Sequence, residues 1–481
     1  MSEGVFDFLR AIVLWTDRFA LMYLLLLSTS YAILLVLSIP ELWKHWRLAA
    51  DEHLRRLLAS DALPPLSLLV PAHNEEVTIA SSVLSFLTLE YPHLEVVVVN
   101  DGSKDKTVEV MMREFDLYEV PPAFAVRLPT KNVRGYYRSR RHARLVVIDK
   151  ENGGKADALN AAMNACRHPF VVAVDADTLI EPDALVRLAR PFLLGANVAA
   201  VGGSVRVANH CIVELGRVRE ARVAPNWIVG CQVVEYLRAF LFGRLAWNML
   251  GGNILISGAF GLFRKEFLFA IGGYKTGNVT EDMDLCVRLQ RHLHENGIKA
   301  ELPFIPDPVA WTEVPSDWGV LGRQRERWHR GLISTLLAHR VMFFNPRYGA
   351  AGMLTYPFFL VGEMMAPVVE VIGWIGLVVG LSIGAINSQF AMLFLVVAIG
   401  FGTLLSVWAI VLEEFSFRRY TRPRDIWRLI GFALIEGLGY RQITVLYRLK
   451  AFWNYLRGVE TWGRMTRSGF GVPPSSSATP K

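Results

Sequence analysis

The feature that most limits the fold is an uninterrupted apolar run near the N-terminus. Residues 20–39 carry no charged side chain, and about 20 helical residues are enough to cross the hydrocarbon core of a bilayer. The basic residues that follow this run are Lys44, Arg47, Arg55 and Arg56. Before it, Arg10 and Arg18 are mixed with acidic residues. Because cytoplasmic flanks are enriched in lysine and arginine, we predict an extracytoplasmic segment at 1–19, a transmembrane helix at 20–40 and a cytoplasmic chain from residue 41 onward.

Composition and charge narrow the class of protein further. Of 481 residues, 52% are hydrophobic, and the formal net charge is +7. That hydrophobic fraction exceeds what a soluble domain usually has, yet 20% charged residues exclude a bundle made only of membrane helices. The basic residues cluster beside apolar runs, which favours an anionic membrane surface over nucleic acid. We therefore expect a lipid bilayer as a partner and no nucleic acid.

A second apolar region occupies the C-terminal part of the chain. We predict a membrane region at 350–470, with spans at about 360–382 and 389–412. Residues 429–447 are ambiguous because Glu436 and Arg441 interrupt a short apolar run, which favours an interfacial or re-entrant helix. The tail at 471–481 is rich in serine and proline, and this composition predicts disorder.

Residues 64–345 have the pattern of an α/β domain. Apolar strands are predicted at 66–71, 94–100 and 170–177, each followed by a helical pattern. Alternating strands and helices predict a largely parallel sheet whose ligand cleft lies at the carboxyl ends of the strands. The basic, proline-containing segment at 121–144 is either a solvated loop or a loop over an anionic ligand or lipid headgroups.

Acidic residues follow each of these predicted strands. Asp175 and Asp177 come after the third strand, and two carboxylates at this spacing can hold one divalent cation while diphosphate oxygens complete its ligands. Glu75 and Asp101 follow the first and second strands, where they are placed to accept hydrogen bonds from a nucleobase and a ribose. The alternative for each acid is an ordinary turn with a helix cap.

Two predicted helices begin with charged groups. Gly153-Gly154 precedes Lys155, whose ammonium would lie over a phosphate at the helix N-terminus. Neither a Walker A pattern nor a dinucleotide-type GxGxxG follows a strand. Thr280, Glu281 and Asp282 open the other helix. There, either Thr280 is a cap and the acids complement the helix dipole, or Asp282 is a general base for an acceptor hydroxyl.

Gln324, Arg327 and Trp328 form the most distinctive group. On a helix, positions i, i+3 and i+4 share one face. An amide, a guanidinium and an indole on one face suit a phosphate and a sugar ring better than a dry core. The alternative is an amphipathic surface helix with the neighbouring leucines packed inward.

Several segments occur in an order that resembles the membrane-embedded family 2 glycosyltransferases, which include the synthases of cellulose, hyaluronan, chitin oligosaccharide and poly-N-acetylglucosamine. The segments are PAHNEE, VNDGS, ENGGKADALN, DADT, SGAFG, TEDMD and QRERW. The resemblance covers roughly residues 64–345. It implies an α/β GT-A fold with flanking transmembrane and interfacial α-helices, a UDP-sugar donor, Mg²⁺ or Mn²⁺, and inversion to a β-linkage.

The same resemblance implies roles for individual residues. The UDP-sugar contacts would be Pro71, His73, Glu75, Asp101, Lys155 and Asp175. Asp177, together with Asp175, would bind the metal, and Asp282 would be the catalytic base. The residues near the diphosphate and acceptor would be Gln324, Arg327, Trp328, Ser257, Gly258 and Glu281. Glu235 and Tyr236 lie where the family often has an acceptor-side motif.

We therefore expect an inverting glycosyltransferase at a bacterial-type inner (plasma) membrane, multi-pass and with its catalytic domain in the cytoplasm. It would transfer a hexose or N-acetylhexosamine from a UDP-sugar to a growing β-linked polysaccharide, with a glycan or lipid acceptor and with accessory secretion subunits as further partners. One alternative adds a single sugar to diacylglycerol or polyprenyl phosphate. The other is a receptor or transporter that keeps the fold without catalysis.

Overall fold

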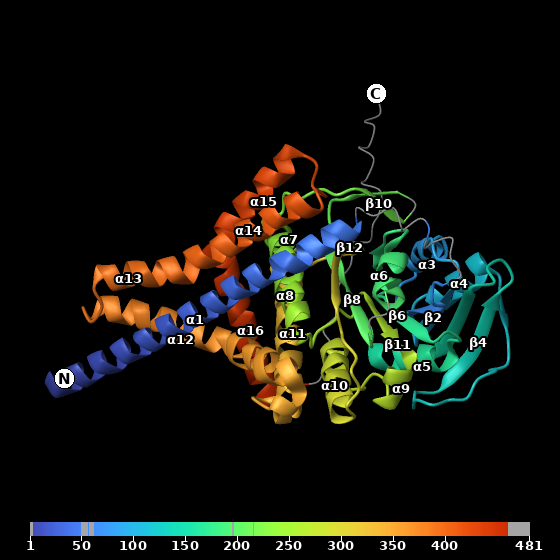
Figure 1. The fold of residues 1–481 in the computed structure, drawn as a ribbon, viewed down its shortest axis with the longest axis horizontal. Helices are drawn as coiled ribbons and strands as arrows, with labels where there is room; N and C mark the ends of the chain where they lie inside the picture. Colours follow the sequence, from blue (N-terminus) through green and yellow to red (C-terminus); the bar gives the residue numbers. More distant parts are fainter. Residues whose placement is uncertain (1–2, 50–55, 57–61, 195–196, 215, 460–481) are drawn as a thin grey trace.

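The computed structural model describes residues 3–49, 56, 62–194, 197–214 and 216–459. Apolar helices project from one side of the molecule, and a twisted sheet with its covering helices forms the other side (Figure 1). The tail predicted to be disordered, 471–481, lies outside the described residues, as does the stretch 460–470 of the predicted membrane region.

Helix α1 extends from Glu3 to Ala49. It includes the span predicted at 20–40, and its stretch Phe6–His45 is long and apolar enough to cross a membrane. Residues 5–39 contain neither glycine nor proline, so nothing in the sequence stops the helix at residue 20. Residues 3–19 are the first turns of α1, and the extracytoplasmic position of 1–19 stays a prediction.

The C-terminal region adds two helices that are long and apolar enough to span a membrane, Ser388–Ser416 and Pro423–Leu456. A bent pair, Ala351–Met364 and Ala366–Ser382, passes the same test together with a 41° bend. The described residues thus hold 3 such helices, or up to 4 if the bent pair is one span. The predicted spans at 360–382 and 389–412 fall within these helices.

The ambiguous stretch at 429–447 lies inside the helix Pro423–Leu456, which is longer than the sequence pattern indicated. Its backbone is not helical at Leu438 and Gly439, so the helix is kinked there. The elements of this region are α12 (Ala366–Ser382), α13 (Ser388–Leu395), α14 (Phe401–Ser416), α15 (Pro423–Ile435) and α16 (Arg441–Leu456).

The sheet has ten strands in the order β3-β4-β5-β2-β1-β6-β11-β8-β12-β7. Along the chain these are β1 (Leu66–Ala72), β2 (Leu94–Asp101), β3 (Leu117–Glu119), β4 (Val133–Ser139), β5 (Leu145–Lys150), β6 (Phe170–Ala173), β7 (Leu179–Ile180), β8 (Ala200–Val207), β11 (Gly261–Arg264) and β12 (Phe304–Thr312). A separate hairpin joins β9 (Ile212–Glu214) to β10 (Arg217–Glu220).

The sheet is mixed. Strand β1 pairs in parallel with β2 and β6, β2 with β5, and β8 with β12. All the pairings of β11, β4 and β7 are antiparallel. The expectation of a largely parallel sheet is therefore wrong outside the central strands. The prediction of a loop throughout 121–144 is wrong as well, because residues 133–139 form β4 between β3 and β5.

Helices cover both faces of the sheet. They are α3 (Ile79–Leu87), α4 (Thr107–Phe115), α5 (Lys155–Ala165), α6 (Ala184–Leu193), α7 (Trp227–Arg238), α8 (Arg244–Leu250), α9 (Lys265–Ala270) and α10 (Glu281–Glu295), and a further helix, α11 (Trp318–Ala338), follows β12. Along β2, Val96 and Val98 enter one apolar core, while Val97 and Val99 enter another on the opposite face. This alternation follows from the two-residue period of a strand, and burial on both faces explains why the sequence is apolar throughout.

Helix α11 packs against α10 and α16, between the sheet and the membrane region. A Cβ atom at Gly322 would lie 2.6 Å from the ring of Tyr447 on α16. A Cβ atom at Gly331 would lie 2.3 Å from the side chain of Thr280, just before α10. These two glycines therefore let α11 approach both neighbours closely, which brings the QRERW helix to the start of α10.

Candidate active site

Lys155 is at the centre of the candidate site. Its Nζ lies 2.6 Å from Asp175 Oδ1 and 3.2 Å from Glu281 Oε1, and it donates a hydrogen bond to Gly258 O at 3.2 Å. These contacts join α5, the turn after β6, the start of α10 and the loop before β11. Burial alone lowers the pKa of Lys155, but Asp175 and Glu281 outweigh burial and raise that pKa above its ordinary value. The side chain is therefore a cation at physiological pH.

Asp282 lies beside this ion pair. Its Oδ2 accepts a hydrogen bond from Gly258 N at 2.9 Å, and its Oδ1 accepts one from Met283 N at 2.8 Å. A Cβ atom at position 258 would lie 3.1 Å from Asp282 Oδ2, so glycine lets the Ser257-Gly258 loop pass directly over the carboxylate. Burial raises the pKa of the neighbouring Glu281. The charge of Lys155 lowers that pKa, and the charge of Asp282 raises it further. The predicted base thus has a fixed orientation in a group of opposing charges.

Asp101 supports the loop that carries Lys155. Its Oδ1 accepts hydrogen bonds from Lys150 Nζ at 2.8 Å and Gly153 N at 2.9 Å, and its Oδ2 accepts one from Gly154 N at 2.8 Å. The side chain of Lys150 is 0% exposed and also pairs with Asp157. The predicted contact between Asp101 and a nucleotide stays a prediction, and such a contact would share oxygen atoms that already hold the glycine turn.

The ends of β1 and β2 meet as their parallel pairing requires. Pro71 is in register with Val99, and His73 Nδ1 lies 2.8 Å from the backbone oxygen of Asp101. Glu75 Oε2 accepts a hydrogen bond from Thr78 Oγ1 at 2.8 Å, as expected for an acid at a strand-to-helix turn. The structure therefore places Pro71, His73 and Asp101 together, while their predicted contacts with a UDP-sugar remain predictions.

Asp175 and Asp177 occupy the turn between β6 and β7. Asp175 pairs with Lys155, and Asp177 is buried, with 7% of its surface exposed. In the part of the chain that the structure describes, no group of three His, Cys, Asp or Glu side chains could hold a metal ion. A divalent cation at this turn would therefore need ligands from a bound diphosphate. Two carboxylates fit that donor set, because Mg²⁺ and Mn²⁺ prefer oxygen ligands.

Gln324, Arg327 and Trp328 do lie on a helix, α11. It begins after Asp317, whose side chain accepts a hydrogen bond from Val320 N at 2.9 Å and caps the helix. Gln324 is buried, Arg327 is partly buried, and Trp328 is 36% exposed. The predicted face thus runs from the interior to the surface, and only its outer end offers an aromatic ring to a ligand.

Arg325, which the sequence pattern left without a role, links α11 to two other helices. It forms an ion pair with Glu235 on α7, and the Tyr440 hydroxyl donates to Glu235 Oε2 at 2.9 Å. The guanidinium also lies over the ring of Trp328, with Cζ 4.9 Å from the ring centroid. Glu235, which the family resemblance put on the acceptor side, therefore has a structural partner in Arg325.

Residues 64–331 match the model of the family described as Glycosyltransferase like family 2. The chain belongs to this family. Its sheet and helices are those of a GT-A glycosyltransferase, with apolar helices at both ends that are candidate membrane spans. The predicted family and fold class are confirmed.

Curated relatives of this family 2 glycosyltransferase include poly-beta-1,6-N-acetyl-D-glucosamine synthases. The protein from Staphylococcus epidermidis is 30% identical over 273 residues, which cover 56% of this chain and 55% of the relative. The protein from Staphylococcus aureus (strain COL) is 28% identical over 278 residues, which cover 58% of this chain and 57% of the relative. The chain thus spans about half the length of the curated relatives it matches.

Two of the solved structures that match this chain do so at low sequence identity. The mannosyltransferase PcManGT from Pyrobaculum calidifontis, in complex with GDP-Man and Mn2+, has 18% identity and a TM-score of 0.49, over 88% of this chain and 99% of that chain. S. aureus TarS 1-349 in complex with UDP-GlcNAc has 14% identity and a TM-score of 0.37, over 79% of this chain and 92% of that chain.

Proposed function

We propose that this family 2 glycosyltransferase transfers N-acetylglucosamine from UDP-GlcNAc to a growing β-linked polysaccharide, with inversion at the anomeric carbon. The observation that carries the proposal is the cluster of Lys155, Asp175, Glu281 and Asp282, which lies at the carboxyl edge of the central strands. The names of the curated relatives support this sugar and a polymeric product.

Asp282 would act as the general base. Its carboxylate accepts hydrogen bonds from Gly258 N and Met283 N, so it can receive a proton without first reorienting. In a single displacement, the acceptor hydroxyl transfers its proton to Asp282 and its oxygen bonds to the anomeric carbon. The bond from that carbon to the β-phosphate oxygen breaks, and UDP leaves with the electron pair.

Charges around the leaving group would favour this displacement. Lys155 lies at the N-terminus of α5, where both the ammonium and the helix dipole favour a diphosphate. Asp177 and Asp175 would hold Mg²⁺ or Mn²⁺, which neutralises charge on a diphosphate when bound. Arg327 would help to neutralise the departing diphosphate, and Trp328 would stack against a sugar ring. Gln324, Ser257 and Gly258 would line the same region.

We further propose that α1 and the C-terminal helices anchor the enzyme in the inner membrane, with the GT-A domain on the cytoplasmic side. Three helices of sufficient length and apolarity support the membrane location, and the basic residues that follow the apolar run 20–39 support the orientation. Under this arrangement, a donor from the cytoplasm would reach the site without crossing the bilayer. Accessory secretion subunits would then receive the product.

The proposal can be tested with purified protein, UDP-GlcNAc and either Mg²⁺ or Mn²⁺. We expect polymer and UDP as products, and an Asp282→Asn variant should lower the rate by about 10²–10⁴-fold. Asp116→Asn is a matched control, because Asp116 is partly exposed and has a left-handed backbone that asparagine adopts equally well. Normal turnover by the Asp282→Asn variant would contradict the proposed base.

A second candidate is the addition of one sugar to a lipid. The basic residues of the segment around β4, including Arg134, Arg138 and Arg140, favour it because they suit anionic headgroups. The size of the product separates the two functions. A ladder of long chains supports the polysaccharide synthase, whereas a single glycolipid would support the alternative.

A further inference from the structure

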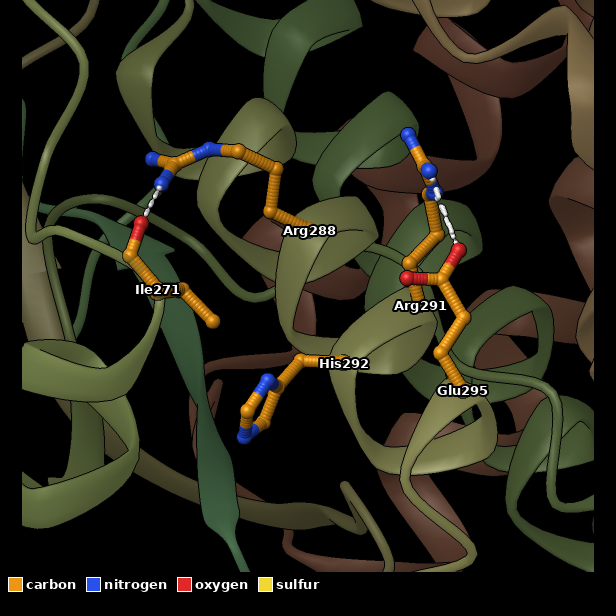
Figure 2. Close-up of a pocket in the computed structure, with 5 residues that line it drawn as sticks. All are labelled: Ile271, Arg288, Arg291, His292 and Glu295. Carbon is orange, nitrogen blue, oxygen red and sulfur yellow. Dashed lines mark hydrogen bonds and ion pairs between the residues drawn. The ribbon is translucent and has the colours of Figure 1, made fainter.

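Arg288 connects the helix of the proposed base to a tight turn. It lies on α10, after Asp282, and its Nε is 2.7 Å from Asp284 Oδ2. The same guanidinium donates hydrogen bonds to the backbone oxygens of Ile271, at 2.7 Å, and Gly273, at 2.8 Å. Figure 2 shows Arg288 reaching across to Ile271. One side chain thus holds α10 against the turn that follows α9.

The partners of Arg288 fix its orientation. The side chain of Asp284 is 1% exposed, and its Oδ1 lies 3.2 Å from Nε2 of His339, just after α11. Burial raises the pKa of Asp284, but His339 and Arg288 outweigh burial and lower that pKa below its ordinary value. Asp284 is therefore a carboxylate at neutral pH. Three acceptors in three directions determine the plane of a guanidinium, whose N–H groups form a rigid fork.

The turn that Arg288 binds is also bound to α5. Asn160, a buried residue of α5, donates a hydrogen bond to Tyr274 O at 2.8 Å and accepts one from Tyr274 N at 2.8 Å. Gly272 and Gly273 have φ of 77° and 70°, a left-handed backbone that favours glycine. A Cβ atom at Gly273 would lie 2.5 Å from Asn160 Oδ1. The turn therefore fits closely against α5 while Arg288 ties it to α10.

These contacts link the two helices on which the proposed reaction depends. Lys155 is the first residue of α5, and Asp282 is in the first turn of α10. At their N-termini the helices are joined by the ion pair of Lys155 with Glu281, 3.2 Å apart. The turn adds a second connection further along both helices. Two separated connections set the relative orientation of two helices, which one connection leaves free.

We propose that Arg288 is a positioning residue for the transfer reaction, holding the start of α10 so that Asp282 keeps its place relative to Lys155. This assignment rests on the proposed role of Asp282 as the base. Arg288 acts through the helix, because its Nε, Nη1 and Nη2 all donate within the protein. Since reaction rates depend steeply on the geometry of the reacting groups, a displaced base should slow the transfer step more than it weakens donor binding.

The test compares the wild-type protein with Arg288→Met, using UDP-GlcNAc as donor and N-acetylglucosamine oligosaccharides as acceptor. We expect kcat, calculated per site that binds UDP in calorimetry, to fall about tenfold to a hundredfold. The KM for UDP-GlcNAc should stay at the wild-type level. Arg288→Lys keeps the charge beside Asp284 without the fork, so its kcat should lie between the two.

An unchanged kcat in Arg288→Met, or a fall in kcat with an equal rise in the donor KM, would overturn the assignment. Thermal unfolding shows whether Arg288→Met folds. If it does not, Arg288→Lys decides the outcome by the same two measurements, and a wild-type kcat in that variant would overturn the assignment.

Combining Arg288→Met with Asp282→Asn shows whether Arg288 acts through the base. If it does, the residual rate of Asp282→Asn should not fall further, because the group that Arg288 positions is already lost. A merely structural role would lower the rates of the wild-type protein and of Asp282→Asn by the same factor. That result would overturn the assignment.

Arg291→Met is a matched control on the same helix. Figure 2 shows Arg291 beside Glu295, 3.0 Å apart, and its Nη1 lies 3.1 Å from His339 Nδ1. Within the part of the chain that the structure describes, Arg291 has no hydrogen bond to the turn at 271–274. Its kcat should therefore stay at the wild-type level. An equal loss of kcat in Arg291→Met and Arg288→Met would overturn the assignment.

Hydrogen exchange at the amides of residues 271–284 separates this inference from the proposed reaction. We expect faster exchange there in Arg288→Met and wild-type exchange in Arg291→Met. If this difference appears but the wild-type protein makes no polymer from UDP-GlcNAc, the proposed function is contradicted while the positioning of α10 by Arg288 stands. If polymer forms and Arg288→Met changes neither exchange nor kcat, the role of Arg288 is contradicted while the proposed function stands.

Discussion

Replacing Lys155 with methionine would leave Asp175 and Glu281 without their shared counter-ion. The ammonium lies 2.6 Å from Asp175 Oδ1 and 3.2 Å from Glu281 Oε1. At an effective dielectric constant of about 20, these separations correspond to gross attractions of roughly 6 and 5 kcal/mol. Desolvation offsets part of this, and removal of one partner from a buried pair typically costs about 3–5 kcal/mol. Methionine keeps most of the side-chain volume, so the loss should be electrostatic.

The loss of stability in Lys155→Met should depend on pH, and its direction follows from the pKa shifts. The pKa of Lys155 is raised, so its stabilising contribution is present below the ordinary lysine pKa of about 10 and the wild-type protein keeps it throughout the neutral range. Burial raises the pKa of Glu281 and Lys155 lowers it, so the variant should have a still higher Glu281 pKa. A carboxyl whose folded pKa is raised loses stability as the pH rises from its unfolded pKa toward its folded pKa. The deficit of the variant should therefore grow as the pH rises above the ordinary glutamate pKa of about 4.3.

Thermal unfolding of the detergent-solubilised protein measures this deficit. We expect the apparent Tm of Lys155→Met to lie roughly 10 °C below that of the wild-type protein near neutral pH, with a smaller gap at lower pH. Lys265→Met is the control, because Lys265 Nζ donates to the backbone oxygen of Cys166 at 2.8 Å and forms no ion pair with a carboxylate among the described residues. A gap that is independent of pH, or that narrows as the pH rises, would refute the electrostatic account.

Two other substitutions test the packing of α11 and the predicted metal site. Gly322→Val should lower the apparent stability by about 1–3 kcal/mol, because even a Cβ atom there would lie 2.6 Å from the ring of Tyr447. The control is Gly431→Ala, since nothing lies within 4 Å of a Cβ atom at that position. Equal thermal stability of the two variants would argue against close packing. Asp177→Asn should weaken the Mn²⁺-dependent binding of UDP, measured by calorimetry, by about tenfold or more. If the wild-type protein binds UDP with the same affinity with and without Mn²⁺, that result would argue against a metal at this turn.

Much of the candidate site was predictable from local sequence. Asp101, Asp175 and Asp282 were identified because each follows an apolar strand or opens a helical pattern, and such positions are set by short-range periodicity. The helical face of Gln324 and Trp328 was predictable for the same reason. The partners were not predictable, because Lys150 and Arg325 form ion pairs with side chains that lie far away along the chain.

What the sequence by itself determined is the set of strongly apolar elements, namely the central strands, the membrane helices and the α/β character of the region between them. These elements are predictable because a segment that is buried has an apolar composition of its own. The tertiary structure alone decided that β11 lies antiparallel between β6 and β8, that residues 133–139 form a strand where a loop was predicted, and that Lys155 pairs with Glu281. Strand order and ion pairing depend on which distant segments come together, and local periodicity does not encode that choice.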